Sequence, residues 1–453
     1  MVMKKAMLVF VSLLLAVLQA ACSYEASKPA DSSTIKVAYR YSGPNTGTEK
    51  WLKKVKQTFE ERHPGKKVEI IPIQASEGTF FAKLALMMKS ADTAPDVVAE
   101  DTFMINADAA AGYIEPLTER VKGWDDWDNF NDRVKKGVTT QDGSIYGVPF
   151  STDTRGIWYN KNIFKKAGLP VPWQPENWND ILTAARTIKE KVPGVTPFWS
   201  FTGRATGEAT AMQTFEMLLY GTDDPLYDEK RDKWVVKSPG ILHALRFIDH
   251  IYSNGLGPPL SQVLNGTAGN TLAEQSMPEE KVAMALHGSF LSGSWVEGGP
   301  APWPEGTKVY GFAPMPTERG QDPGKISLSG GWALSISAKS KHKDLAWEFI
   351  KLATNKENNK YYVLNEGDLT PRDDVAEDPE YQNAPGRNFQ QSTEFLEFTD
   401  FRPGNEDYPA VSTKIQIAVE SVATGKASPE QAMEQYAQSV EALVGPENVM
   451  KKE

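Results

Sequence analysis

The chain of 453 residues contains one cysteine, five histidines and no long basic run. A lone thiol, Cys22, cannot form an internal disulfide. With a formal net charge of −10, the chain lacks the positive footprint that releases counterions from phosphates, so nucleic-acid binding is not expected. Neither GxxxxGK[ST] nor GxGxxG follows a predicted strand, so a phosphate-binding loop is not indicated.

Patterns typical of catalysis or of metal binding are also missing. No GxSxG elbow occurs. His243 and His250 share a predicted helix, but no carboxylate lies at metal-ligand spacing. The acidic segment 124–132, WDDWDNFND, has neither the glycine nor the closing glutamate of a calcium loop, which favours a solvated loop. We therefore predict no metal and no cofactor.

The N-terminus has the pattern of an export signal. Lys4 and Lys5 precede an apolar run over residues 6–18 that is too short to span a bilayer comfortably. The run leads into "LQAAC", which ends at Cys22. One interpretation is cleavage after Ala-Ala, with an incidental cysteine. The other is a lipobox-like site, with Gln19 at the usual leucine position and Cys22 acylated. We favour lipidation, with residues 1–21 as signal peptide and 22–33 as a flexible tether.

Strand and helix patterns alternate after the tether. We predict strands over 34–41, 67–73 and 94–101, and helices over 49–63 and 79–90. This order is typical of an α/β domain with a mainly parallel sheet. Ligands of such sheets bind beyond the carboxyl ends of the strands. Segments 41–45 and 100–103, with Tyr41, Glu100 and Phe103, are therefore candidates for a binding site.

The rest of the chain is richer in helix. We predict helices over 179–191, 208–220, 241–254 and 343–352, and a strand over 327–337, SLSGGWALSIS. A final helix begins with the capping-box pattern of Ser428, Pro429 and Gln431. After residue 33 no apolar run approaches the length of a membrane span.

Twelve tryptophans form a notable supply of rings, and several lie beside polar residues. Sugars stack their C–H faces on such rings, while their hydroxyls bond to charged side chains. Trp295 and Trp332 are the best candidates, and packing in a core is the alternative for each. The pair Gly330-Gly331 favours a binding role for Trp332, because glycine lets the backbone come close to a ligand.

A series of segments then carries a resemblance to a known family. They run in order through nearly the whole chain after the tether: "APDVV" followed by "AAAGYIEPL", "YGVPFSTDTRGIWYNKNIFKKAGL", "KVAMALHGSF", "SGGWALSISAKSKHKDLAWEFIKL" and "ATGKASPEQAMEQYAQSV". The chain resembles the extracellular solute-binding proteins of carbohydrate ABC importers, the branch that includes maltose-binding protein. Each segment alone is weak, but the ordered series is specific for the family.

The resemblance implies a two-lobed fold of the type II periplasmic-binding-protein kind. Each lobe would be a mainly parallel sheet flanked by helices, and hinge strands would join the lobes around a ligand cleft. We expect lobe 1 to comprise residues 34–151 plus 317–367. Lobe 2 would comprise residues 152–316 plus 368–453.

The resemblance also implies site residues. Asp153 falls where relatives place an acidic sugar contact, and Arg155 is either a second ligand contact or the partner that orients Asp153. Phe290 falls where many relatives carry a stacking tryptophan, so either Phe290 stacks or Trp295 replaces it. Glu100 and Phe103 match the ligand loop of the first lobe.

A segment of the second lobe, "FRPGNEDYP", matches a cleft-lining stretch of the family. It contributes Arg402 and Tyr408, whose alternative roles are a helix cap or a surface ion pair. Together with Tyr41 and Trp332 from the first lobe, these residues would contact the ligand from both sides. Contacts with both lobes are needed, because only differential affinity shifts a protein between its open and closed forms.

The resemblance implies capture without catalysis. A mono- or oligosaccharide would bind in the cleft, and the closed monomer would deliver it to the permease subunits of an ABC transporter. The protein would be exported and lipid-anchored to the outer face of the cytoplasmic membrane. Two alternatives stay open: an exported glycan hydrolase that uses paired carboxylates, and a binding protein for a non-sugar solute.

Overall fold

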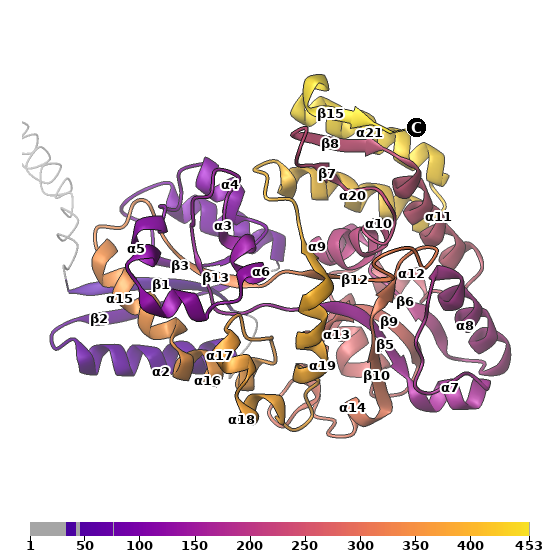
Figure 1. Ribbon diagram of the computed structural model, residues 1–453, viewed down its shortest axis with the longest axis horizontal. Helices are drawn as coiled ribbons and strands as arrows, with labels where there is room; N and C mark the ends of the chain where they lie inside the picture. Colours follow the sequence, from indigo (N-terminus) through magenta and orange to yellow (C-terminus); the bar gives the residue numbers. More distant parts are fainter. Residues whose placement is uncertain (1–32, 42–45, 76, 453) are drawn as a thin grey trace, which may run out of the picture.

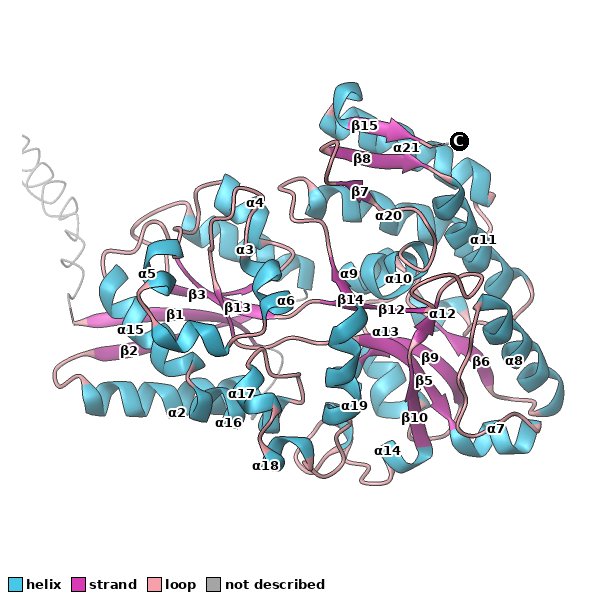
Figure 2. Cartoon of the chain, in the orientation of Figure 1, coloured by secondary structure: helices cyan, strands magenta, loops and turns pink. Residues whose placement is uncertain are grey.

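The computed structural model describes residues 33–41, 46–75 and 77–452. The predicted signal peptide, Cys22 and residues 42–45 lie outside the described residues. The chain forms two lobes side by side, joined by extended segments (Figure 1). Each lobe has its own sheet and its own helices (Figure 2). This two-lobed α/β fold confirms the predicted fold class.

The sheet of lobe 1 has the strand order β2-β1-β3-β13-β4. Its strands are β1 (Thr34–Tyr41), β2 (Lys67–Gln74), β3 (Val97–Asp101), β4 (Val148–Pro149) and β13 (Trp332–Ile336). β1 is parallel to β2 and β3, whereas β13 is antiparallel to both β3 and β4. Four of the five strands thus point the same way, and β13 is reversed. β13 is the strand through which the chain re-enters the lobe.

Strand alternation assigns the two faces of this sheet to different helices. Val37 of β1 and Ala99 of β3 face a core shared with α2 (Gly47–Arg62), α15 (Lys343–Thr354) and α16 (Lys356–Glu366). Ala38 and Val98, one residue along, face a core with α3 (Glu77–Met88) and α4 (Ile105–Ala110). Successive side chains of a strand point to opposite faces. The same alternation places Glu100 and Asp101, at the end of β3, on opposite faces of the sheet.

The main sheet of lobe 2 has the order β10-β5-β9-β6. It comprises β5 (Arg155–Asn160), β6 (Thr196–Trp199), β9 (Val282–Gly288) and β10 (Tyr310–Ala313). β5 is antiparallel to β9 and β10, and β6 is parallel to β9, so three of the four strands share a direction. The reversed strand, β5, again follows a crossing between the lobes. Two small sheets complete the molecule: β11 (Met315–Pro316), β12 (Lys325–Ser329) with β14 (Thr399–Phe401), and β7 (Tyr227–Asp228), β8 (Lys233–Lys237) with β15 (Val449–Lys451).

Most long helices lie where the sequence predicts them. In lobe 2, α8 (Trp178–Lys191), α11 (Pro239–Ser253) and α21 (Pro429–Val444) do so, whereas the short α7 (Lys161–Ala167) and the long α20 (Tyr408–Ala423) were not predicted. Both reciprocal hydrogen bonds of the predicted capping box, between Ser428 and Gln431, are present at the start of α21. The predicted helix over 208–220 is instead divided into α9 (Glu208–Thr210), the π-helical segment η4 (Ala211–Glu216) and α10 (Met217–Leu219).

Shorter helical segments connect these elements. They are α5 (Thr118–Lys122), η1 (Asp125–Asn129), α6 (Asp132–Lys135), η2 (Lys136–Val138), η3 (Arg204–Thr206), α12 (Leu260–Val263), α13 (Ala268–Asn270), η5 (Thr271–Ser276), η6 (Ser289–Trp295), α14 (Gly306–Val309), α17 (Asp373–Ala376), α18 (Pro379–Gln382), α19 (Phe389–Glu394), η7 (Phe395–Phe398) and η8 (Pro446–Asn448). None of the helices within the described ranges combines the length and apolar character needed to cross a membrane.

Thr152, in the first crossing between the lobes, is bonded to Gly330 in the second crossing and to Leu369, which packs in the core of lobe 1. Its backbone N–H and C=O pair with Leu369 at 2.9 Å each, and its hydroxyl donates to the carbonyl of Gly330 at 3.0 Å. The predicted strand over 327–337 is therefore two strands, β12 and β13. The chain turns between them at Gly331, where φ is +131°, a value that favours glycine.

The hydrophobic cores divide the chain at residues that differ from the predicted boundaries. Ile326 and Leu328, predicted for lobe 1, pack in the core of lobe 2 because β12 pairs with β14 there. Val375, Tyr381 and Phe389, predicted for lobe 2, pack in the core of lobe 1. The second and third crossings therefore lie later in the chain than the sequence indicates.

Candidate functional site

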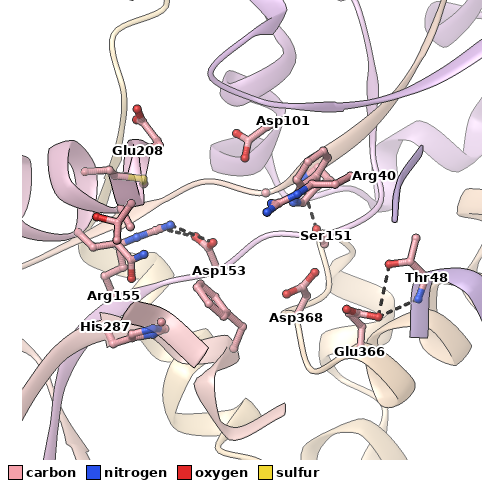
Figure 3. A pocket seen from close by; sticks show the side chains of 18 of the residues that line it. Arg40, Thr48, Asp101, Ser151, Asp153, Arg155, Glu208, His287, Glu366 and Asp368 are labelled. Atoms are coloured by element: carbon pink, nitrogen blue, oxygen red, sulfur yellow. Dashed lines mark hydrogen bonds and ion pairs between the residues drawn. The ribbon is translucent and has the colours of Figure 1, made fainter. Parts of the chain in front are cut away.

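A cavity of about 430 Å³ lies between the two lobes (Figure 3). This volume falls within the roughly 300–1,000 Å³ that is usual for small-molecule sites. Lobe 1, lobe 2 and the crossing segments all contribute side chains to its wall. The cavity is therefore placed where a bound molecule would contact both lobes at once.

Asp153 and Arg155 form a buried ion pair in the wall. Arg155 Nη1 donates to Asp153 Oδ1 at 2.5 Å and to the carbonyl of Leu328 at 3.0 Å. Asp153 Oδ1 also accepts from the backbone N–H of Gly330 at 2.7 Å. Both side chains line the cavity. Arg155 thus orients Asp153, one of its two predicted roles, and the pair ties the first crossing to the second.

Arg402 connects the two lobes across the cavity. Its Nη2 donates to Asp101 Oδ1 at 2.8 Å and to the Thr102 hydroxyl at 2.9 Å, both in lobe 1. Its Nη1 donates to Glu208 Oε1 of lobe 2 at 3.3 Å. The ring of Phe103 lies under the guanidinium at 4.9 Å. A single cation therefore joins carboxylates of opposite lobes.

A hydrogen-bond network continues behind Glu208. The Tyr408 hydroxyl lies 2.5 Å from Glu208 Oε1 and 2.6 Å from Glu216 Oε1, and Ser412 donates to Glu208 Oε2 at 2.6 Å. Burial raises the pKa of Glu216 to about 8, and the charge of Glu208 adds to the effect. A phenol has one proton for its two neighbours. We infer that Tyr408 donates to Glu208 and that protonated Glu216 donates to the Tyr408 oxygen.

Two further carboxyl groups face the cavity from lobe 1, across from Asp153 (Figure 3). Glu366 Oε2 accepts from the backbone N–H of Thr48 at 2.7 Å, at the first turn of α2. Asp368 Oδ2 accepts from the Tyr362 hydroxyl at 2.7 Å. Burial raises the pKa of Asp368 to about 7, and the charge of Glu366 raises it further.

Aromatic rings supply apolar wall on both sides. Trp332 lines the cavity from lobe 1 and is braced by a stacked contact with Phe81, at 6.2 Å between ring centroids. Phe290 lines it from lobe 2, with its ring centroid 5.1 Å from that of His287. Burial lowers the pKa of His287 to about 4, so this imidazole is neutral at physiological pH. Rings on two walls with charged groups between them suit a polyhydroxylated molecule.

Five of the ten predicted site residues line the cavity, and the other five lie elsewhere in the structure. Those that line it are Asp153, Arg155, Phe290, Trp332 and Arg402. Those that do not are Tyr41, Glu100, Phe103, Tyr408 and Trp295. Tyr41 packs against the core of lobe 1, while Phe103 and Tyr408 support Arg402 and Glu208 from outside the cavity.

Glu100 faces away from the cavity because of strand alternation. Asp101 shares the face of Ala99 and reaches the cavity, whereas Glu100 shares the face of Val98. The Glu100 carboxyl is fully buried near Asp108, and burial, together with the charge of that neighbour, raises its pKa. The acidic group at the end of β3 that reaches the cavity is therefore Asp101.

Trp295 is a core residue in this structure. Its ring packs against Trp158, Trp303 and Tyr310, and its indole N–H donates to the carbonyl of Ala273 at 2.9 Å. The side chain is 1% exposed. Of the two predicted stacking platforms, only Phe290 faces the cavity.

Several residues of the cavity wall were not predicted from the sequence. They are Arg40, Thr48, Asp101, Glu208, Gln213, His287, Glu366 and Asp368. Only Asp101 had a local signal, the alternation of β3, and that pattern alone does not say which face meets the cavity. Arg40 and His287 lie within strands, and the others lie in helical segments or turns; all of them meet neighbours that are far away in the sequence. Within the described part of the chain, no group of three or more His, Cys, Asp or Glu is arranged to hold a metal ion.

Several known proteins are similar to this chain in sequence and in fold. The multiple sugar-binding protein of Streptococcus mutans is 27% identical over 374 residues, which cover 78% of this chain and 79% of that protein. An ABC transporter solute-binding protein of Thermotoga lettingae, solved with alpha-D-tagatose, is 26% identical with a TM-score of 0.75, covering 91% of this chain and all of that one. Maltose-bound MalE3 of T. maritima has the same fold at 23% identity, with a TM-score of 0.75 and coverages of 91% and 100%.

The chain also matches a protein family over most of its length. Residues 43–360 match the bacterial extracellular solute-binding proteins, a span that includes the main sheet of lobe 2, every strand of the lobe 1 sheet except β1, and most of the cavity wall. Sequence, fold and a cavity enclosed between two lobes agree, and the chain therefore belongs to the family of bacterial extracellular solute-binding proteins.

Proposed function

We propose that this protein binds a saccharide in the cavity between its lobes and delivers it to the permease of an ABC transporter. The observation that carries the proposal is the wall of that cavity. It combines the rings of Trp332 and Phe290 with the buried, oriented carboxylate of Asp153. Rings of this kind stack on sugar C–H faces, and an oriented carboxylate accepts hydroxyl hydrogen bonds. The names of the relatives, which include sugar-binding proteins, support the same ligand class.

Binding would proceed by closure without chemistry. A ligand held by Trp332 of lobe 1 and by Phe290 of lobe 2 gains contacts from both sides only when the lobes are together. Such a ligand shifts the population toward the closed form by its differential affinity for that form. The closed form is then the species that docks on the permease.

Calorimetry against a panel of mono- and oligosaccharides tests the proposal. We expect at least one sugar to bind with a 1:1 stoichiometry and to raise the melting temperature. Stabilisation by a peptide or by a polyamine, with no sugar active, would contradict saccharide binding. Release of new reducing ends from oligosaccharides would contradict binding without catalysis.

We also propose that the protein is a monomer, anchored through acylated Cys22. The sequence "LQAAC" and the polar stretch after it motivate this assignment. Mass spectrometry of the mature N-terminus in a bacterial host should find a lipid-modified Cys22. A Cys22→Ala variant should be released from the membrane fraction, and its retention there would contradict the anchor.

A further inference from the structure

Two carboxyl groups of the cavity lack the cationic partner that the others have. Asp153 pairs with an arginine, and Arg402 serves both Asp101 and Glu208. Among the described residues, no ion pair includes either of the remaining carboxylates, Glu366 and Asp368, although both line the cavity. Arg40 lines the same cavity from lobe 1 but is not ion-paired with Glu366 or Asp368, so these two acidic groups have no direct counter-ion among the described residues.

This acidic pair is held in place by its surroundings. The amide of Thr48, in the first turn of α2, donates to Glu366 Oε2. The contact needs Gly47, since a Cβ at that position would come within 2.6 Å of the same oxygen. The Tyr362 hydroxyl donates to Asp368 Oδ2. Because each group is anchored through one oxygen, neither can easily turn away to find a cation elsewhere.

Neighbouring groups do not neutralise the pair. Burial raises the pKa of Asp368 and of Glu366, and the nearby charge of Asp153 adds to the effect on Asp368. Arg387 acts on both only through its longer-range field, since it forms an ion pair with neither, and burial lowers its own pKa to about 10. The segment 42–45, SGPN, which precedes Thr48, contains no basic residue. Arg40 and Arg387 thus add positive charge near the pair, but a direct counter-ion for the two carboxyl groups is left to the ligand.

Building on the proposed saccharide binding, we propose that Glu366 and Asp368 form a subsite for a basic amine, so that the preferred ligand is an amine-bearing saccharide. An ammonium group offers three donors and a positive charge to the two carboxylates. A neutral sugar closed into the cavity would leave these carboxyl groups either to bind a proton or to stay charged without a counter-ion, and both cost free energy. A sugar with a carboxylate or phosphate at this position would add repulsion.

The test compares amino sugars with their hydroxyl parents on the unmodified protein. Each amino sugar is compared with the sugar that carries a hydroxyl in place of the amine at carbon 2, 3 or 6. The pairs are tested as monosaccharides and as disaccharides such as chitosan dimer and cellobiose. N-acetylated and uronate forms complete each set. We expect at least one amine to bind tenfold or more tighter than its parent, its acetylated form and its uronate. Parents that bind as tightly as every amine would overturn the amine subsite while leaving saccharide binding intact. Absence of binding by any member would contradict the proposed function itself.

Variants locate the preference on the two carboxyl groups. Glu366→Gln and Asp368→Asn should each reduce the amine-to-hydroxyl affinity ratio at least fivefold. Glu377→Gln, which removes the same charge at an exposed position of lobe 1, should leave the ratio unchanged. Melting curves identify any variant that fails to fold, and the comparison on the unmodified protein does not depend on them. A preference that persists in both cavity variants would place the amine elsewhere and overturn this assignment.

Discussion

At the scale of single residues, two tryptophans have different surroundings, because one lines the cavity and the other packs in a hydrophobic core. Trp332 and Trp295 both lie near glycines, and both were candidates for stacking on a sugar. Trp332 lies at the start of a strand that faces the cavity, with Phe81 bracing its ring. Trp295 lies in the core of lobe 2, where its indole N–H donates to the backbone carbonyl of Ala273.

Substitution of these two tryptophans should separate binding from stability. Trp332→Ala should weaken ligand binding by about 1 kcal/mol or more, because a stacking partner is lost. Trp295→Ala should instead lower the free energy of unfolding by roughly 3–5 kcal/mol, as for other buried aromatic truncations. Calorimetry and denaturant unfolding measure the two effects. Unchanged affinity in Trp332→Ala would remove Trp332 from the site.

Glu216 gives a prediction about pH. Its pKa in the folded protein is about 8 against an ordinary 4.5, so between these values the folded state holds a proton that the unfolded chain has released. Stability contributed by this group therefore falls as pH rises through that window. Linkage sets an upper limit of about 1.4 kcal/mol for each pH unit.

A Glu216→Gln variant tests this linkage. Glutamine has the same shape, does not titrate, and can still donate to the Tyr408 oxygen. We expect its melting temperature, relative to the parent protein, to rise steadily from pH 5 to pH 8. Glu377→Gln, at an exposed position, provides the control and should follow the parent protein. A constant difference across this range would show that Glu216 does not titrate there.

At the scale of elements, glycines let the two lobes approach backbone to backbone. Gly293 of η6 in lobe 2 lies against the end of α16 in lobe 1. A Cβ on Gly293 would come within 2.6 Å of the carbonyl oxygen of Glu366. The opposing residue, Gly367, has φ +102°, so a side chain there would also strain the backbone. The contact adjoins the acidic wall of the cavity.

Gly293→Ala should therefore hinder the approach of the lobes. We expect ligand affinity to fall about tenfold or more, with the melting temperature of the ligand-free protein little changed. Gly123→Ala is a matched control, because a Cβ there would have its nearest neighbour at 3.9 Å. Affinity equal to that of the control would show that the Gly293 contact is not needed for closure.

At the scale of the whole molecule, Arg402 links the two lobes directly. It bonds Asp101 on one side of the cavity and Glu208 on the other. All three groups line the cavity, so a ligand that enters it can compete with or extend these contacts. On the proposed mechanism of closure, the balance between open and closed forms depends on these charges inside the site.

Asp101→Asn should shift this balance toward the open form. A hydrogen bond to a charged group contributes about 1.5–3 kcal/mol, so its weakening should change the population roughly tenfold. Small-angle scattering of the ligand-free protein should show a larger radius of gyration. Asp344→Asn breaks an exposed pair with Arg120 within lobe 1 and should have no effect. Equal radii in both variants would exclude Arg402 as an interlobe link.

The sequence by itself determined the local structure of this protein. Alternation and helical periodicity predicted β1, α2, β2 and β3, and the capping box marked the start of α21, because these signals depend on near neighbours. The ordered family segments predicted the two lobes and the cavity position of Asp153, whereas the pair Gly330-Gly331 predicted that of Trp332.

Only the tertiary structure determined that Glu366 and Asp368 lie together in the cavity wall, and which face of β3 meets the cavity. Thr48 and Glu366 are 318 residues apart in sequence, so no local pattern predicts their hydrogen bond. Alternation predicts that Glu100 and Asp101 point in opposite directions, but which of them reaches the ligand depends on the helices that cover each face. Residues that meet across a cleft are brought together by packing, and packing is a property of the whole chain.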